Sequence, residues 1–577
     1  MNNYIMRLEE KIKKIINELG YDVNDVALLS SSRKDLGEYQ YNGAMALAKQ
    51  YHKNPIVIAN EIVNELSKED IFQNINVAGP GFINATFSPK ALKEFLCDEG
   101  NYITKKDKLI FIDYGGANVA KCLHVGHLRS ANIGQALYNL TKFLGYNVIG
   151  DSHLGDFGRP LGLVLLEIKK RYPDLVFFDK NYTGTYPDTI PVTNKDLEEI
   201  YPYASQKSKE DPEYLEEAQE MTKMLQDKVP GIYDLWKLVV GISKKDIIGI
   251  YDRLNAKFDL YEGESDANDY IDDTLKILYD KGLVYTSENA EVMDVSNEND
   301  TAPMPPMLIK KSNGALLYST TELATLYERV NKYHPDEIWY VVDNRQELHF
   351  VQAFRAGYIS GIVPSNVKLV FAGFGTMNGS DGKPFKTRSG GVMRLEDLLE
   401  YVKSETVKRL KENIDLDEKD DIAETISMGA LKYADLLSLR NTDYSFDPAK
   451  FGSLDGKTAP YIQYSIVRIK SLLNKAIESN IVFDNNIEFY EEEREVILSL
   501  MGEYQVVINS FNSLSLNDIC EYLYKLTSTY NRFYSENQIL TCPSPEKRKS
   551  YLYLSKKVME TSISLLNVLG IKVPNRM

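Results

Sequence analysis

The stretch from Ile110 to Ser130 constrains the fold most, because it encodes a strand, a turn of small residues and a helix in direct succession. Residues 109–112 form an apolar, β-favouring run, which is typical of a buried strand. Residues 115–117, Gly-Gly-Ala, follow and allow another group to approach the backbone closely. Apolar side chains then recur at helical spacing from Leu128 to Leu144. In this order the free N–H groups and the positive end of the helix dipole point at an anion, so we predict an anion site there.

Two histidines, His124 and His127, flank Val125 and Gly126 at the start of this helix. Imidazole groups there can donate hydrogen bonds to phosphate oxygens on which charge grows during nucleotidyl transfer. Gly126 leaves room for a flat ring to lie against the backbone. The stretch lacks the Gly-x-x-x-x-Gly-Lys-Ser/Thr pattern of P-loops, so a nucleotide would be held differently. A purely structural role for both histidines is the alternative.

The composition describes an ordinary globular protein with several domains. Its 577 residues exceed the roughly 250–300 at which a single core stops growing. The net charge of −16 counts against a generally basic nucleic-acid binder, although local patches can still bind RNA. Four scattered cysteines without metal-ligand spacing indicate a reduced cytoplasm and no structural metal. The sequence contains no apolar run of about eighteen residues, and its N-terminal helix is too charged for a signal or transit peptide, so we predict no membrane segment.

Residues 1–105 have the pattern of a small α+β domain, which begins with an amphipathic helix from Ile5 to Leu19. Arg33 and Lys34 precede Tyr39 and Tyr41, a combination that can contact a nucleic-acid backbone and stack a base; a solvated loop is the alternative. The other predicted elements of this domain are strands over 27–29, 75–77 and 82–87 and helices over 41–51 and 55–66.

Residues 106–395 alternate strands and helices in two halves, which predicts a doubly wound parallel sheet of Rossmann type, that is, an α/β fold. The segment His153–Gly158 follows a predicted strand over 147–151 and so stands where open α/β sheets bind ligands. In the second half we predict strands over 307–310, 316–318 and 337–342, and helices over 323–333, capped by Thr320 or Thr321, and over 349–357.

An insertion at about 165–290 separates the two halves. Residues 196–227 carry dense charge and few large apolar side chains, so we expect exposed helices there, whereas 236–254 is more apolar and should pack. A separate helical domain is the alternative.

Five side chains at predicted strand ends and helix starts can accept hydrogen bonds from a planar cation. A guanidinium is always charged and carries five donors in a rigid fork, so its burial needs carboxylate and amide acceptors. Each charge-assisted hydrogen bond contributes about 1.5–3 kcal/mol. For any single residue the alternative is an ordinary surface position. The five residues are Asp113, Asn118, Tyr318, Glu322 and Gln346.

A glycine-rich, basic loop runs from Phe374 to Gly391. The cations of Lys383 and Lys386 suit the stabilisation of pyrophosphate as it leaves, and Arg388 would position the loop. The alternative is a surface hairpin with solvated lysines. From the residues alone, either lysine can do the main work.

Periodic helical segments dominate after Leu395, with a connector over 396–440 and a helical domain over 441–577. Tyrosine and phenylalanine stand next to cations in this domain, for example in Tyr530–Tyr534, and such pairs can bind unpaired RNA. Aromatic residues at helical spacing more often belong to the core, which is the alternative.

Asn118-Val-Ala-Lys121-x-x-His124-Val-Gly-His127-Leu-Arg-Ser130 resembles the His-Ile-Gly-His signature of class I aminoacyl-tRNA synthetases, and its flanks resemble those of the arginyl family in particular. The 374–391 loop is similar to a degenerate form of the second class I signature, Lys-Met-Ser-Lys-Ser. The order of elements in residues 1–105, and residues 79–84 in particular, resemble the family's N-terminal tRNA-binding domain, which contacts the tRNA elbow. Residues 441–577 resemble its anticodon-binding domain. The chain departs from the family pattern at Phe157, at Arg159-Pro160 and at Glu322, where Asp is usual.

This resemblance implies ATP-dependent activation of L-arginine to arginyl-adenylate, transfer to the terminal ribose of tRNA(Arg), and a requirement for bound tRNA in the first step. ATP is then a substrate, Mg²⁺ accompanies it, and we expect a monomer without membrane contact. The implied catalytic residues are His124, His127, Lys383 and Lys386. The implied ATP-binding residues are Ala117, Asn118, Lys121, His124, Gly126, His127, Lys383 and Lys386. The implied arginine-binding residues are Asp113, Asn118, His124, Tyr318, Glu322 and Gln346. For tRNA the landmarks are Tyr461, Gln463, Tyr464 and Arg468, without assigned bases.

Two other functions compete with this reading. A small-molecule nucleotidyltransferase can use a similar His-x-Gly-His site, but it would need neither the N-terminal domain nor the helical tail. A non-catalytic tRNA-binding paralogue is compatible with the unusual Glu322 and Arg159-Pro160.

Overall fold

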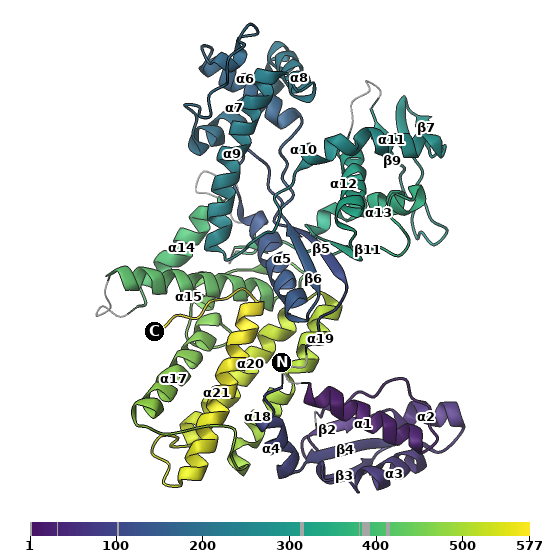
Figure 1. Ribbon diagram of the computed structural model, residues 1–577, viewed down its shortest axis with the longest axis vertical. Coiled ribbons are helices and arrows are strands. Elements are labelled where there is room, and N and C mark those ends of the chain that lie inside the picture. Colours follow the sequence, from purple (N-terminus) through teal and green to yellow (C-terminus); the bar gives the residue numbers. More distant parts are fainter. Residues whose placement is uncertain are drawn as a thin grey trace. The chain divides into compact units, whose positions relative to one another are not determined.

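The structure is a computed structural model that describes residues 3–31, 33–100, 103–311, 317–379, 381–383, 393–410 and 416–577. The chain forms two compact units, and Figure 1 labels their helices and strands. The first unit comprises Met1–Thr104, Ser453–Asn567 and Lys572–Met577. The second unit comprises Lys105–Gly452 and Val568–Ile571.

The N-terminal part of the first unit is an antiparallel sheet in the order β1-β2-β4-β3 with helices packed on it. The predicted helix over 55–66 and strand over 82–87 are confirmed. Pro55 stands in the first turn of its helix, and the Asn54 side chain caps that turn by accepting the N–H of Ile56. The strands are β1 (Leu29–Ser30), β2 (Tyr39–Tyr41), β3 (Phe72–Ala78) and β4 (Phe82–Phe87), and the helices are α1 (Tyr4–Glu18), α2 (Ala44–Tyr51), α3 (Pro55–Leu66) and α4 (Pro89–Cys97).

The proposed base-stacking role of Tyr39 and Tyr41 is wrong. Both lie on β2, a strand that the sequence reading missed, and their side chains are only 6% and 5% exposed. Alternate residues of a strand share one face, so both rings point into the core, where Tyr39 packs edge-on against Phe87.

The rest of the first unit is helical, as predicted. Helix α17 begins at a cap in which the Thr458 hydroxyl accepts the N–H of Tyr461. Ile462, Ile466 and Ile469 recur at helical spacing and are fully buried. The elements are α17 (Ala459–Glu478), η4 (Glu491–Glu493), α18 (Arg494–Met501), α19 (Glu503–Ser513), α20 (Asn517–Glu536) and α21 (Pro545–Val568).

The second unit is built on a parallel sheet in the order β11-β10-β5-β6, which confirms the doubly wound prediction. The first half of the chain supplies β5 and β6, the second half supplies β10 and β11, and the two halves meet where β5 pairs with β10. Ligands bind at such a switch point, outside the carboxyl ends of the strands. The strands are β5 (Leu109–Tyr114), β6 (Asn147–Asp151), β10 (Glu337–Val341) and β11 (Lys368–Phe371), and the helices beside them are α5 (Val125–Phe143), α6 (Arg159–Arg171), α12 (Tyr318–Tyr333), η3 (Asn344–Gln346) and α13 (Glu347–Ser360).

Helix α12 begins earlier than predicted. Tyr318 is its first residue rather than the end of a strand, so neither Thr320 nor Thr321 caps it. The Thr320 hydroxyl instead donates to the carbonyl of Ile309 on the neighbouring strand. The sequence also predicts a Ser312-Asn313-Gly314 turn between the strands over 307–310 and 316–318, and this turn lies outside the described residues. The remaining elements of this half are α10 (Glu264–Ala267), η2 (Asn268–Tyr270), α11 (Ile271–Asp280), an antiparallel sheet of β7 (Val284–Ser287), β8 (Ala290–Met293) and β9 (Met307–Lys310), β12 (Met377–Asn378), α14 (Leu395–Val407), α15 (Leu416–Leu437), β13 (Tyr444–Ser445) and α16 (Pro448–Phe451).

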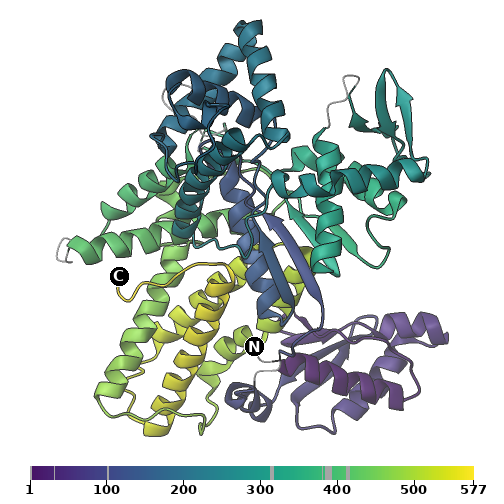
Figure 2. The ribbon, with the colours of Figure 1, turned by 45° about the horizontal axis from the view of Figure 1, so that its top comes forward.

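The insertion is a helical bundle, drawn in dark teal near the top of Figure 2. It contains η1 (Val176–Phe178), α7 (Asn194–Glu210), α8 (Pro212–Gln226) and α9 (Pro230–Arg253). The packing predicted for 236–254 is confirmed, but the exposed character predicted for 196–227 is only half right. Leu197, Tyr214 and Leu225 are buried, because a narrow apolar stripe is enough to seat each helix while its other faces remain charged.

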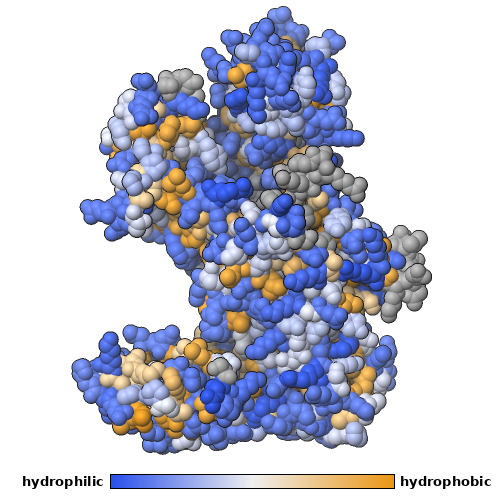
Figure 3. All heavy atoms as spheres, turned by 180° about the vertical axis from the view of Figure 1, so that it is seen from behind, coloured by the Kyte–Doolittle hydropathy of each residue, from blue (hydrophilic) through white to orange (hydrophobic). Residues whose placement is uncertain are grey.

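The exposed side chains seen in Figure 3 are predominantly hydrophilic. Among the described residues, every helix is too short or too polar to span a lipid bilayer.

Candidate active site

Helix α5 begins with a cap made by the two predicted histidines. His124 is the N-cap residue, and its Nδ1 atom accepts a hydrogen bond of 3.0 Å from the N–H of Gly126. The Nδ1 atom of His127 in turn accepts a hydrogen bond of 3.0 Å from the N–H of His124. This reciprocal arrangement satisfies two N–H groups that a helix start otherwise leaves unpaired. The structural role considered as the alternative is therefore present.

The capping bonds also define how the imidazoles can act. Because each Nδ1 atom accepts a hydrogen bond, a neutral ring carries its proton on Nε2. Burial lowers the pKa of His124, and it lowers the pKa of His127 to about 3. Both rings are therefore neutral at pH 7 and offer an Nε2–H donor. The flat ring beside Gly126 is that of His124, because a Cβ atom there would lie 2.7 Å from its Cε1 atom.

A cavity of about 500 Å³ opens at the carboxyl ends of β5 and β10, beside the starts of α5 and α12. All five predicted guanidinium acceptors line it, together with both histidines. Residues from both halves of the sheet thus meet at one edge. The predicted site residues in its lining are Asp113, Ala117, Asn118, His124, Gly126, His127, Tyr318, Glu322 and Gln346.

Helix α9 of the insertion supports the backbone next to the cavity. The Ser243 hydroxyl accepts the N–H of Ala120 at 3.0 Å, and the Tyr251 hydroxyl donates to the carbonyl of Gly115 at 2.7 Å. Ala120 has a φ of 59°, a left-handed conformation that residues with a side chain seldom adopt. The hydrogen bond from its N–H to α9 helps to hold this conformation.

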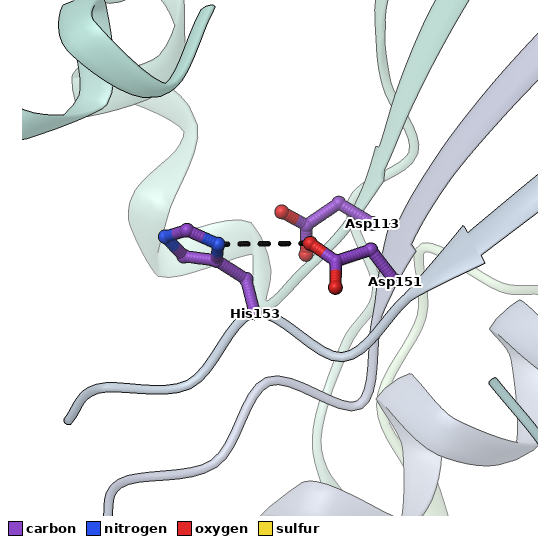
Figure 4. A group of neighbouring side chains, drawn as sticks. All are labelled: Asp113, Asp151 and His153. Carbon is purple, nitrogen blue, oxygen red and sulfur yellow. Dashed lines mark ion pairs between the residues drawn. The ribbon is translucent and has the colours of Figure 1, made fainter. Parts of the chain in front are cut away.

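Two acids and two bases form a cluster beside the cavity. Figure 4 shows one ring nitrogen of His153 turned toward the carboxylate of Asp151, which lies beside that of Asp113. The Nδ1 atom of His153 is 3.6 Å from Asp151, the distance of an ion pair rather than a hydrogen bond. The side chains of Asp113, Asp151 and His153 are close enough to share a metal ion. The guanidinium of Arg329 already bridges the two carboxylates, at 2.7 and 2.9 Å, so the cluster carries its own cation and does not fit a metal.

The charges within this cluster depend on one another. Burial raises the pKa of Asp113, although Arg329 acts against it. For Asp151, burial is outweighed by His153 and Arg329, which lower its pKa. Burial lowers the pKa of His153, but the two carboxylates outweigh it and raise that pKa to about 9. His153 is therefore cationic at pH 7.

Glu322 projects into the cavity from α12 and is only 5% exposed. Its carboxylate lies 3.9 Å from Nε2 of His349 on α13. The His349 ring does not line the cavity but packs against the ring of Tyr318, with 4.7 Å between the centroids. Burial raises the pKa of Glu322, but His349 and Arg329 outweigh it and lower that pKa, so the carboxylate is ionised at pH 7.

The site also contains residues that were not found from the sequence, and Glu264 and Arg329 are the two that matter most for its charge. Glu264 lines the cavity because the chain returns from the insertion along the sheet edge, in bridges that join Asp151 to Leu260 and Leu154 to Gly263. No local sequence pattern predicts that the chain returns to the sheet at this point. Burial raises the pKa of Glu264 to about 7. Arg329 did carry a signal, since it follows Glu322 by two helical turns and so shares its face of α12.

Other predicted residues lie elsewhere. The ammonium group of Lys121 lies 4.6 Å from the centroid of the Tyr201 ring on α7, and Lys121 is not among the described residues that line the cavity. Lys383 is exposed and does not line it either. Lys386 and Arg388 lie outside the described residues.

The predicted tRNA landmarks lie on α17 in the first unit. Tyr464 is 43% exposed. Gln463 is fully buried, and its Nε2 atom donates to the carbonyl of Lys572 at 2.7 Å, which does not fit a contact with RNA. Neighbouring residues of a helix point about 100° apart, so one can belong to the core and the next to the surface.

Tyr461 and Arg468 converge on Asn531 of α20. The amide of Asn531 donates to the Tyr461 hydroxyl at 2.9 Å and accepts a hydrogen bond from Arg468. The guanidinium of Arg468 also lies 4.2 Å from the centroid of the Tyr534 ring. Both landmark residues thus take part in holding α17 to α20.

Three family models match the chain. Residues 6–87 match the N-terminal domain of arginyl-tRNA synthetases, 91–448 the catalytic domain of class I tRNA synthetases (R), and 462–577 the DALR anticodon-binding domain.

The arginine–tRNA ligase of Agathobacter rectalis is 42% identical, and the alignment covers 100% of both chains. The arginine–tRNA ligase of Francisella tularensis is 39% identical, and the alignment covers 99% of both chains. Among solved structures, arginyl-tRNA synthetases have the same fold, with TM-scores of 0.80 for Plasmodium falciparum (24% identity, 99% of both chains) and 0.75 for Thermus thermophilus (21% identity, 99% of this chain and 100% of that one). With one family model spanning more than half of its length and full-length relatives at this identity, the chain belongs to the arginyl-tRNA synthetase family of class I.

Proposed function

We propose that this chain charges tRNA(Arg) with L-arginine at the expense of ATP. The observation that carries the proposal is the cavity at the carboxyl edge of the sheet, whose lining combines two neutral histidines that carry Nε2–H donors with acids suited to one guanidinium. A triphosphate and a cationic amino acid are the two ligands that such a lining accepts.

The orientation of arginine follows from the charges. The carboxylates of Asp113 and Asp151 are already paired with Arg329. The guanidinium of the substrate would therefore lie between Glu264 and Glu322, near the Tyr318 hydroxyl. The α-ammonium and α-carboxylate groups of the substrate would then lie near the amides of Asn118 and Gln346, which can both donate and accept hydrogen bonds.

In the first step, an oxygen of the arginine carboxylate forms a bond to the α-phosphorus of ATP, and the bond from that phosphorus to the bridging oxygen breaks. The Nε2–H groups of His124 and His127 and the start of α5 would stabilise the negative charge that grows on the phosphate oxygens. Lys383 and Lys386 would stabilise the departing pyrophosphate, as the family resemblance implies. In the second step, a terminal ribose hydroxyl attacks the arginyl carbonyl and AMP leaves. Mg²⁺ would enter with the phosphates of ATP, and we expect the active form to be a cytoplasmic monomer.

The decisive experiment measures two reactions of the purified full chain: ATP–pyrophosphate exchange with and without arginine and tRNA(Arg), and charging of tRNA with radiolabelled arginine. We expect both reactions to require arginine and tRNA. A folded chain that binds tRNA but forms no arginyl-tRNA would indicate the paralogue. Exchange that persists without tRNA, and without the helical tail, would indicate a small-molecule enzyme.

Arginine binding should weaken at low pH, because Glu264 has a pKa of about 7 and only its ionised form attracts the guanidinium. The neighbouring charges of His153, Asp156 and Glu322 also act on this pKa. For a single proton, KM for arginine should fall about tenfold between pH 6 and pH 8. Steady-state exchange assays over this range test it, and Glu264→Gln should remove the dependence. An unchanged slope in that variant would assign it to another group.

Replacing Tyr464 with alanine should raise KM for tRNA about tenfold, because a base stacked on an aromatic ring contributes about 1–3 kcal/mol. Its ring is the most accessible of the four landmarks. Charging assays at varied tRNA measure the effect, and KM for ATP should not change. Ile477→Ala, at a 61% exposed position on the same helix, is the matched control. If both variants behave alike, Tyr464 does not contact RNA.

A further inference from the structure

The side chain of Arg329 occupies what is chemically a guanidinium-binding site. It is fully buried, and one of its nitrogens donates to Asp113 at 2.7 Å and to Asp151 at 2.9 Å. Its Cζ atom lies 4.7 Å from the ring centroid of Phe111 and 5.3 Å from that of Tyr340. Two carboxylates that accept its hydrogen bonds and two aromatic rings over which it lies form a site that binds guanidinium groups well.

This inner site adjoins the cavity. Asp113 contributes to both, since it lines the cavity and accepts the hydrogen bond from Arg329. The Nε and Nη1 atoms of Arg329 have no hydrogen-bond partner among the described residues, so packing and charge, rather than a complete set of hydrogen bonds, hold the group. The protein thus places its own guanidinium next to the position proposed for the guanidinium of the substrate.

We infer that Arg329 is a positioning residue that determines how deeply the substrate arginine binds. It does so by filling a second guanidinium site that the substrate would otherwise enter. This inference rests on the proposed function. With the inner site filled, the substrate guanidinium must remain at Glu264 and Glu322. With the inner site vacant, arginine would bind deeper and its carboxylate would be drawn away from ATP. Deeper binding is non-productive, so it lowers kcat and KM for arginine together.

Arg329→Ala tests this inference in arginine- and tRNA-dependent ATP–pyrophosphate exchange. We expect kcat to fall at least about tenfold, KM for arginine to stay level or fall, and KM for ATP to change little. Guanidinium ion at about 20 mM, far below denaturing concentrations, should restore kcat by filling the vacated site, whereas ammonium ion should not. A merely structural role would not produce this selective rescue.

Arg129→Ala is the matched control. Arg129 is also a buried arginine, only 1% exposed, but it binds Asp435 and the carbonyls of Gly375 and Thr442. It does not line the cavity. Its loss should disturb folding without lowering KM for arginine selectively.

The truncation leaves two buried carboxylates facing each other, which destabilises the fold. The charge-balanced double variant Asp151→Asn, Arg329→Ala removes one of these carboxylates together with the cation and keeps the inner site vacant for guanidinium ion. It is assayed in the same way if the single variant does not fold. The inference is overturned if KM for arginine rises while kcat is unchanged, if KM for ATP and KM for arginine shift in parallel, or if guanidinium ion restores neither variant. Absence of exchange in the unaltered chain would refute the proposed function instead.

Discussion

Replacing His127 with asparagine should lower the rate of arginyl-adenylate formation about 10²–10³-fold while leaving helix α5 capped. The Oδ1 atom of asparagine can take the place of Nδ1 and still accept the N–H of His124. The Nε2–H donor of this cavity-lining residue is lost. Pre-steady-state exchange at saturating ATP and arginine measures the rate, and thermal unfolding measures the cap. The same argument applies to His124→Asn, whose Oδ1 atom would accept the N–H of Gly126.

The reciprocal variants complete this test. In His127→Gln the amide can reach the position of Nε2 but no longer that of Nδ1, so activity should be retained better than stability. The loss of a capping bond costs about 1 kcal/mol of the free energy of unfolding. Thr193→Ala, which removes a similar capping box from α7, should show the same loss of stability with full activity. If the asparagine and glutamine variants are equally inactive, the two nitrogens do not have separate roles.

Replacing Glu322 with glutamine should raise KM for arginine about 10²-fold and leave KM for ATP unchanged. Its carboxylate is ionised and 5% exposed, so a guanidinium bound there would form charge-assisted hydrogen bonds in a water-poor site. Two such bonds contribute about 3 kcal/mol or more in total. Exchange assays at varied arginine measure this change.

Two further variants sharpen the result. Glu322→Asp restores the residue usual in the family and keeps the charge, so KM should change by less than about tenfold. Glu328→Gln is the matched control, because Glu328 is also a buried acid of α12 but is paired with Lys332 and does not line the cavity. An increase in KM of the same size in the control would mean that the effect arises from α12 as a whole.

The sequence was most informative where one contiguous stretch specifies a complete unit. Residues 109–145 predicted strand, turn and helix, and the structure contains β5 and α5 there. The acceptors for a guanidinium could be proposed one at a time, because strand ends and helix starts are local features. Their meeting in one cavity depends on the pairing of β10 with β5, two strands that the insertion separates in the sequence. Local sequence patterns do not specify such a long-range contact.

The failures have equally local causes. The prediction omits β2 and begins a helix at Tyr41 instead, because β2 is only three residues long and offers too few alternations to recognise. Gln463 was carried over from the family resemblance, and a motif match does not show which side of a helix is buried. Glu264 could not be found at all, because its place depends on where the insertion rejoins the sheet.

The hydrogen bonds from Ser243 and Tyr251 give the insertion a part in the geometry of the turn that precedes α5. A minimal catalytic fragment that omits residues 165–290 would leave the N–H of Ala120 and the carbonyl of Gly115 without these partners. Protein engineers who wish to shorten this enzyme should therefore trim the outer helices α7 and α8 and retain α9 as an internal brace.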